Sequence, residues 1–166
     1  MTRLECAIEQ IRLAREYTLR LLAMIDSADW YRIPPGGVSN VAWQVGHLAM
    51  AEYRLCLDRI RGVRPGDDEI IPRAYLTQFG RGSVPDPDPA RNPPAEELRR
   101  VLERVHEQSL RELAGVSDDD LDAPPGSPHP LFNTKFGALT WTARHEMLHA
   151  GQLGLIRRQL GAAPLP

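Results

Sequence analysis

Apolar side chains recur at helical spacing in four separate parts of the chain. In the first part, five apolar residues follow i, i+3/i+4 spacing with Arg and Glu between them: Leu4, Ile8, Ile11, Leu22 and Ile25. This pattern predicts one long helix over roughly residues 2 to 28. Two prolines and two glycines at residues 34–37 then prevent the helix from continuing.

The second apolar segment predicts a helix over about residues 40 to 61, which ends at Gly62 and Pro65. Ser39 and Asn40 are both suitable N-caps for it. Its first half is apolar on all sides of the helix: Val41, Ala42, Trp43, Val45, Leu48, Ala49, Met50 and Ala51. Such a helix is either buried on more than one side or part of a subunit interface, and we therefore expect a homodimer.

Residues 63–94 contain seven prolines and lack the alternation of a strand. We expect a long connection with one short helical turn near Tyr75. About 30 residues are too many for a tight hairpin between antiparallel helices, so the connection is a crossover that runs the length of the molecule.

The third and fourth apolar segments predict two further helices. One follows Pro93 and stops near Gly115, and its apolar face carries Leu98, Leu102, Val105, Ser109 and Leu113. A second proline-rich loop spans residues 118–130, and the last helix runs from about Gly137 to Gly161. One stripe of that last helix carries Trp141, His145, Leu148, His149, Gln152, Leu155, Ile156 and Gln159. The chain is therefore predicted to be all-α, one domain over residues 1–166, and a four-helix bundle with a long crossover between helices 2 and 3.

Composition narrows the choice of partners and compartment. The 166 residues carry a net charge of −2, and Lys135 is the only lysine, so a nucleic-acid partner is not expected. The longest uncharged stretch, residues 33–51, contains prolines and glycines, and a membrane span is not expected either. Cys6 and Cys56 form no disulfide framework and no signal peptide is evident, which favours the cytoplasm.

The sequence His145-Glu146-Met147-Leu148-His149 is the densest cluster of metal-ligand side chains in the chain. Helix positions four apart are separated by about 6 Å of rise and about 40° of rotation, so both imidazoles can reach one ion. Because both histidines share the face of Leu148, Leu155 and Ile156, we expect them to point into the bundle interior, where an imidazole needs a partner.

The same residues form an H-E-x-x-H pattern, which is typical of zinc peptidases with the glutamate as general base. The longer metzincin pattern requires Gly and His where this chain has Gln152 and Leu155. Residues 150–166 also contain no Asp, Glu or His that could supply a third ligand. The peptidase interpretation is therefore disfavoured, and the third ligand must come from elsewhere: the candidates are His47, His106, His129 and Glu52.

Two groups of residues resemble the DinB-like (YfiT-like) superfamily of metal-binding bundles. They are Asn40-x-x-Trp43-x-x-Gly46-His47-Leu48-x-x-x-Glu52 and, about 90 residues later, His145-x-x-x-His149-x-Gly151-Gln152 with Arg158-x-Leu160-Gly161. The resemblance implies a four-helix bundle with an up-down-down-up path. It also implies a three-histidine metal site formed by His47, His145 and His149, and it supports the homodimer.

The resemblance further implies an activity, because members of that superfamily include transferases and isomerases that use low-molecular-weight thiols. We expect a divalent metal ion, with zinc and nickel as first candidates, and a metal-activated thiolate that attacks an electrophilic small molecule. The alternatives are a hydrolase with metal-activated water and a non-catalytic metal- or ligand-binding bundle. Glu146 is the candidate proton acceptor, or else a residue that orients an imidazole.

Overall fold

The computed structural model describes residues 1–163, which are all-helical and contain no strand. The helices are α1 (Arg3–Ala23), α2 (Val41–Glu52), α3 (Arg59–Arg61), α4 (Asp67–Ile70), α5 (Arg73–Gln78), α6 (Ala95–Leu113) and α7 (Lys135–Gln159). A π-helical segment, Tyr53–Asp58, joins α2 to α3 without a break. Within this part of the chain, no helix combines the length and the apolar character that a bilayer crossing requires.

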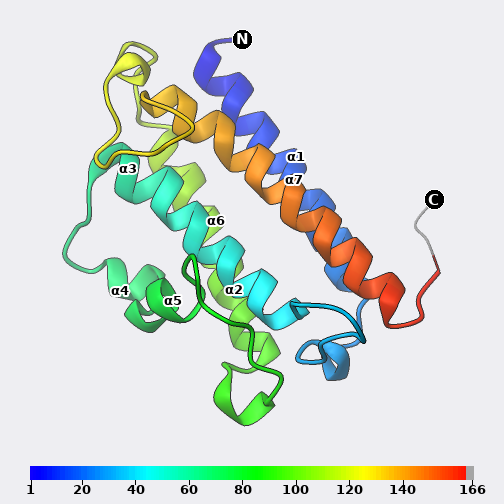
Figure 1. The fold of residues 1–166 in the computed structure, drawn as a ribbon. Helices are drawn as coiled ribbons and strands as arrows, with labels where there is room; N and C mark the ends of the chain where they lie inside the picture. The colour runs from blue at the N-terminus through cyan, green and yellow to red at the C-terminus, as the bar shows by residue number, and fades with distance from the viewer. Residues whose placement is uncertain (164–166) are drawn as a thin grey trace.

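The long helices lie side by side, with α1 along α7 and α2 against both α6 and α7 (Figure 1). The connection from α3 to α6 crosses back along the outside of α2 and carries α4 and α5. The predicted crossover is therefore present, but it contains two short helices where the sequence predicted one helical turn.

The helix ends follow from local capping. Thr2 and Glu5 form a capping box at the start of α1, each side chain bonding the backbone N–H of the other. The helix ends at Ala23, five residues before the predicted end, because Asp26 caps a separate 3₁₀ turn, Ser27–Asp29. At the other end of the chain, Thr134 caps α7, which begins two residues before the predicted Gly137.

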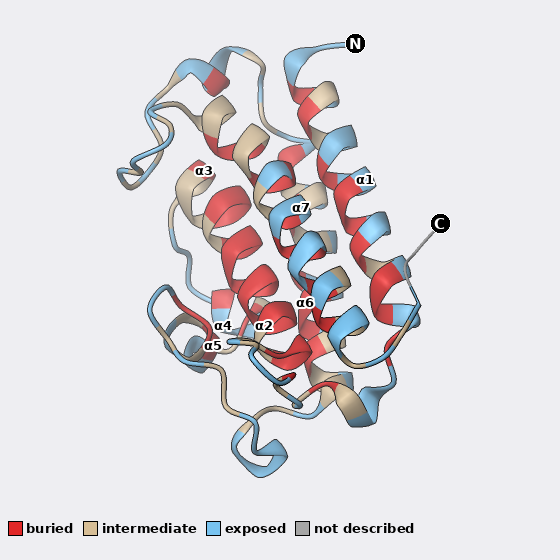
Figure 2. Cartoon of the chain, turned by 45° about the vertical axis from the view of Figure 1, so that its right-hand side comes forward, coloured by how far each residue is buried: buried red, intermediate tan, exposed pale blue. Residues whose placement is uncertain are grey.

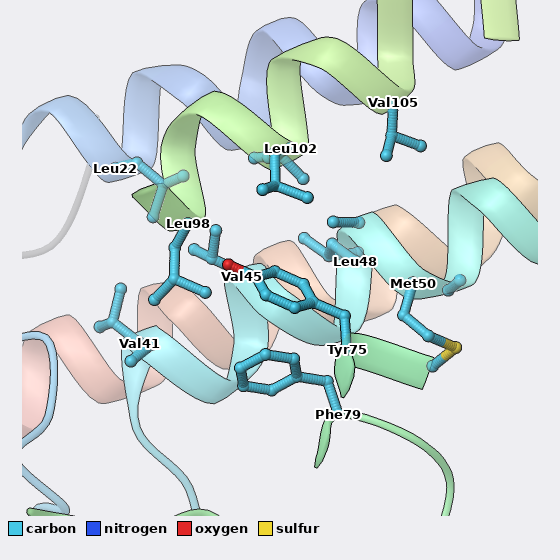
Figure 3. Close-up of a cluster of buried hydrophobic side chains, with 14 of the residues drawn as sticks. Leu22, Val41, Val45, Leu48, Met50, Tyr75, Phe79, Leu98, Leu102 and Val105 are labelled. Carbon is cyan, nitrogen blue, oxygen red and sulfur yellow. The ribbon is translucent and has the colours of Figure 1, made fainter. Parts of the chain in front are cut away.

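The second helix is buried on all sides within the chain itself (Figure 2). Asn40, one of the two residues predicted as its N-cap, accepts a hydrogen bond from the Trp43 N–H. Tyr75 and Phe79, from α5 and its end, cover one face, and α6 covers another (Figure 3). The all-round apolar pattern thus has an intrachain cause, and the homodimer stays a prediction.

The predicted buried face is confirmed on α6 but is partly wrong on α7. On α6, the five predicted face residues are all buried. On α7, the predicted stripe is wrong at Leu148 and Leu155, which are 58% and 54% exposed, and its Gln152 and Gln159 are exposed as well. The buried face instead carries Ala138, Leu139, Thr142, Ala143, Glu146, His149, Ala150, Leu153 and Ile156. Small residues on this face allow α1 to pack closely, so the helix turns its alanines rather than those two leucines inward.

We predict that Gly46→Ala destabilises the protein by about 1–3 kcal/mol, because overpacking a filled core forces its neighbours to move. A Cβ at this position would lie 2.6 Å from the ring of Phe79, which is fully buried. The measurement is the free energy of unfolding in urea. The control is Gly154→Ala, which meets no atom within 4 Å and should gain about 0.5–1 kcal/mol from the lower helix cost of Ala. A Gly46→Ala variant as stable as the wild type would contradict the packing described.

Candidate metal centre

Three histidines from two helices meet in the interior. His47 comes from α2, and His145 and His149 come from α7. One ring nitrogen from each lies within 4.8 Å of the other two. His47 and His149 are buried and His145 is half-buried. The predicted convergence of these three side chains, one of them about 100 residues from the others, is confirmed.

Hydrogen bonds at the far side of two rings orient their nitrogens. His47 Nδ1 lies 2.7 Å from the carbonyl oxygen of Phe79, and His149 Nδ1 lies 2.6 Å from Oε1 of Gln44. Because these oxygens only accept, both Nδ1 atoms carry the proton. Each Nε2 of a neutral ring is then left with its lone pair, which is the form that binds a metal.

The orientation of the Gln44 amide is itself determined by its neighbours. Its Nε2 donates to Ser39 Oγ at 2.9 Å and to Gln152 Oε1 at 2.8 Å. The amide oxygen is therefore the atom turned toward His149. Ser39 and Gln152 thus orient Gln44, and Gln44 holds the imidazole of His149 in the ligating tautomer.

The spacing of one pair of nitrogens fits a shared divalent ion. His47 Nε2 and His145 Nε2 are 3.4 Å apart, and two imidazoles that bind one tetrahedral ion at about 2.0–2.1 Å have their nitrogens about 3.3 Å apart. Since the proton of His47 is on Nδ1, its Nε2 has a free lone pair on the side that faces His145. An all-imidazole donor set suits Zn, Ni, Cu and Fe.

All three histidines are neutral at neutral pH. Burial, with smaller contributions from His47 and His129, lowers the pKa of His145 to about 4. Burial lowers the pKa of His149 to about 3, with contributions from His145 and His47. Burial also lowers the pKa of His47, partly opposed by its bond to Phe79. At neutral pH, protons therefore do not compete for these nitrogens.

Two of the other candidate ligands, Glu52 and His106, belong to a separate cluster that also contains Glu146. Arg15 on α1, 2% exposed, lies between two carboxylates, with Nε 2.7 Å from Glu146 and Nη2 2.8 Å from Glu52. Both oxygens of Glu146 accept from this guanidinium, and the second oxygen of Glu52 accepts from His106 Nδ1 at 2.8 Å. Glu146 and Glu52 thus both bond Arg15, and His106 bonds Glu52, so none of the three joins the triad. Proton transfer by Glu146 stays a prediction.

The charges in this cluster are mutually dependent. Burial by itself raises the pKa of the Glu52 carboxyl, but the charge of Arg15 and the hydrogen bond from His106 outweigh burial and lower it. Burial likewise lowers the pKa of Arg15, and the two carboxylates more than reverse that effect. Each ion is therefore stable in the interior only because the others are present.

A cavity of about 800 Å³ opens beside the triad. His47 and His145 line it, together with Trp43, Met50 and Trp141. The ring of Trp43 stacks on that of His47, with centroids 4.7 Å apart. His129, the weakest of the candidate ligands, also faces this cavity from the second proline-rich loop. The triad is thus accessible to a small molecule from one side.

Sequence reasoning missed Arg15 and Gln44. Arg15 lies four residues after Ile11 on the apolar face of α1, and a charged residue at a core position is a signal for a buried ion pair. Gln44 is an isolated polar residue three positions before His47 in an otherwise apolar segment. The contribution of the Phe79 carbonyl has no sequence signal, because any residue could supply it.

We predict that Gln44→Leu weakens metal binding by about 10–100-fold, as is typical when an outer partner of a ligating histidine is removed. His149 then loses the acceptor that keeps its proton on Nδ1. Competition with a chromophoric chelator measures the affinity, and circular dichroism checks the fold. Gln10→Leu, on the exposed side of α1, is the control. An affinity equal to that of the wild type would contradict the orienting role of Gln44.

We predict that Arg15→Met costs about 3–5 kcal/mol of stability at pH 7, because removing one partner leaves buried charges uncompensated. The loss should be smaller near pH 4. In the wild type the pKa of Glu52 is below its unfolded value of 4.5, so its stabilisation is complete above that value and is lost as pH falls through the folded pKa. In the variant, protonation of the orphaned carboxylates relieves the penalty instead. Urea unfolding at both pH values measures this, and a loss independent of pH would contradict it.

A family model described as the DinB superfamily matches residues 10–153, a range that includes all three histidines of the triad. No curated protein matches the chain. The extent of the family match, together with the triad inside it, shows that the chain belongs to the DinB superfamily.

Proposed function

We propose that this protein is a metal-dependent transferase in which a low-molecular-weight thiol attacks an electrophilic small molecule. His47, His145 and His149 would hold the divalent ion, with zinc and nickel as first candidates. The observation that carries the proposal is the pair of Nδ1 hydrogen bonds, to Phe79 and Gln44, that leaves the Nε2 lone pairs of His47 and His149 free for a metal ion. As part of the same proposal, the long helices form a four-helix bundle with an up-down-down-up path, and the protein works as a homodimer in the cytoplasm.

A bound divalent ion with three neutral ligands would keep a thiol deprotonated near neutral pH and so supply a nucleophile. The residues of the chain prepare that site. Phe79 and Gln44 fix the imidazoles, and Trp43 shields one face of His47. Glu146, held through both oxygens by Arg15, is a positioning residue that anchors α7 next to His145.

The cavity favours a catalytic site over a structural one. Structural zinc sites are closed by four protein ligands, whereas catalytic sites keep a position open to substrate. The triad offers three ligands, and two of these histidines line a cavity of about 800 Å³. The same opening could admit water, so metal-dependent hydrolysis is the alternative that the experiment must separate from thiol transfer.

We predict metal-dependent thiol consumption when the zinc- or nickel-loaded protein meets a panel of electrophiles. Loss of free thiol, measured with a chromogenic disulfide, should fall at least 100-fold in the double variant His47→Ala, His145→Ala, because two of the three ligands are gone. His106→Gln is the matched control, since His106 bonds Glu52 outside the triad and glutamine keeps a donor.

The outcomes separate the candidate functions. Ester or amide hydrolysis without thiol loss would favour the hydrolase. Metal binding with neither reaction would favour a non-catalytic bundle. Thiol loss that persists in the double variant would reject the triad as the reaction site.

A further inference from the structure

The cavity beside the triad is strongly cationic. Arg54, Arg59 and Arg81 line it, and no aspartate or glutamate does. Arg54 and Arg59 are half-buried and Arg81 is exposed. Two other guanidinium groups in the interior, those of Arg15 and Arg61, have carboxylate partners. The three cavity arginines differ from them in this respect.

These arginines lack anionic partners. Within residues 1–163, none of the three makes an ion pair. Arg54 donates to the Leu76 carbonyl at a long 3.3 Å, and Arg59 donates to the Arg54 carbonyl at 3.4 Å. The Nε of Arg59 is buried without any partner. A buried charged donor without an acceptor is costly, and an anion bound in the cavity would supply that acceptor.

The π-helical segment brings two of these arginines to the same side. The backbone N–H of Arg59 bonds the carbonyl of Arg54, five residues earlier, so the two lie one π-helical turn apart. In an α-helix, residues five apart point about 140° away from each other. π-Helical turns are frequent at functional sites, and here the turn directs both arginines to the cavity that His47 shares.

The electrostatic effect of the three arginines extends across the cavity. The charge of Arg54 contributes to the lowered pKa of His47, after burial. Burial lowers the pKa of His129 first, and the charges of Arg59 and Arg81 lower it further. Apart from these cations, much of the wall is apolar, with Trp43, Met50, Leu55, Leu131 and Trp141. A complementary ligand combines an apolar body with an anionic group.

We propose that the cavity binds a small organic oxyanion, a carboxylate or a phosphate ester, whose anionic group is held by Arg54 and Arg59 while its apolar part packs against Trp43 and Trp141. Guanidinium groups suit both anions because their paired N–H groups match the geometry of two oxygens. The proposal rests on the proposed function only in that this anion would be the thiol or the electrophile of the same site.

Calorimetry on the metal-free protein tests the proposal with three probes that share one apolar body. They are 2-naphthoate, 2-naphthyl phosphate and the neutral 2-naphthamide. We expect at least one anion to bind about 10-fold or more tightly than the amide, as a charge-assisted hydrogen bond of about 1.5–3 kcal/mol requires. The tighter of the two anions identifies the group that the site prefers. Equal binding of all three probes, or no binding, overturns the proposal.

Two variants test the assignment to residues. Arg54→Gln and Arg59→Gln should each weaken binding of the preferred anion about 10-fold and leave binding of the amide unchanged. The control, Arg12→Gln, alters an exposed arginine of α1 outside the cavity and should bind both probes as the wild type does. Thermal unfolding shows whether each variant is folded. An anion preference that survives in both variants, or that is present only after metal is added, overturns the arginine site.

The outcome is independent of the transferase test. If anion preference is lost with the arginines but no thiol is consumed, the oxyanion site stands and the transferase fails. If thiol is consumed but the anions bind no better than the amide, the reverse holds.

Discussion

The structure depends on a buried cation between two buried anions. Arg15 of α1 bonds Glu52 at the end of α2, Glu146 of α7 and the Leu102 carbonyl of α6, so one side chain joins all the long helices. Ion pairs in the interior are favourable only when their geometry is good. A shift of any one helix by a single residue would separate charges that cannot reach water, and the network therefore defines the register of the helices.

The same register determines where the three histidines of the candidate metal centre meet. Glu146 is adjacent in sequence to His145, and Glu52 lies five residues after His47. Where Arg15 holds these two carboxylates together, the histidines of α2 and α7 are brought within 4.8 Å of one another. The charged cluster and the neutral triad are thus two consequences of one alignment of α2 and α7. The neutral state of the triad, maintained by burial, keeps its nitrogens available to a cation.

Several elements were predictable because their signals are local. The apolar face of α6 repeats at helical spacing between two prolines and a glycine, and every predicted face residue is buried. The i, i+4 pair His145 and His149 follows from helix geometry alone. On α7 the same reasoning failed, since alanines, a glutamate and leucines surround the helix and periodicity does not show which of them its neighbours will cover. Leu148 and Leu155 were expected to be buried because they share a stripe with the two histidines, whereas close packing with α1 selected the alanine face.

The sequence by itself determined an all-helical chain, its long crossover and a pair of histidines able to share one ion, because capping, proline positions and i, i+4 spacing act within a few residues. His47 could be nominated from its apolar surroundings and a family resemblance, but only packing of α2 against α7 brought it to the pair. The tertiary structure also decided the tautomers, through Phe79 and Gln44, and buried Arg15 between its carboxylates. It also placed Arg54 and Arg59 at the same cavity through a π-helical turn, which no short-range pattern in the chain predicts. These features arise from contacts between segments tens of residues apart, and their energy exists only once the helices are assembled.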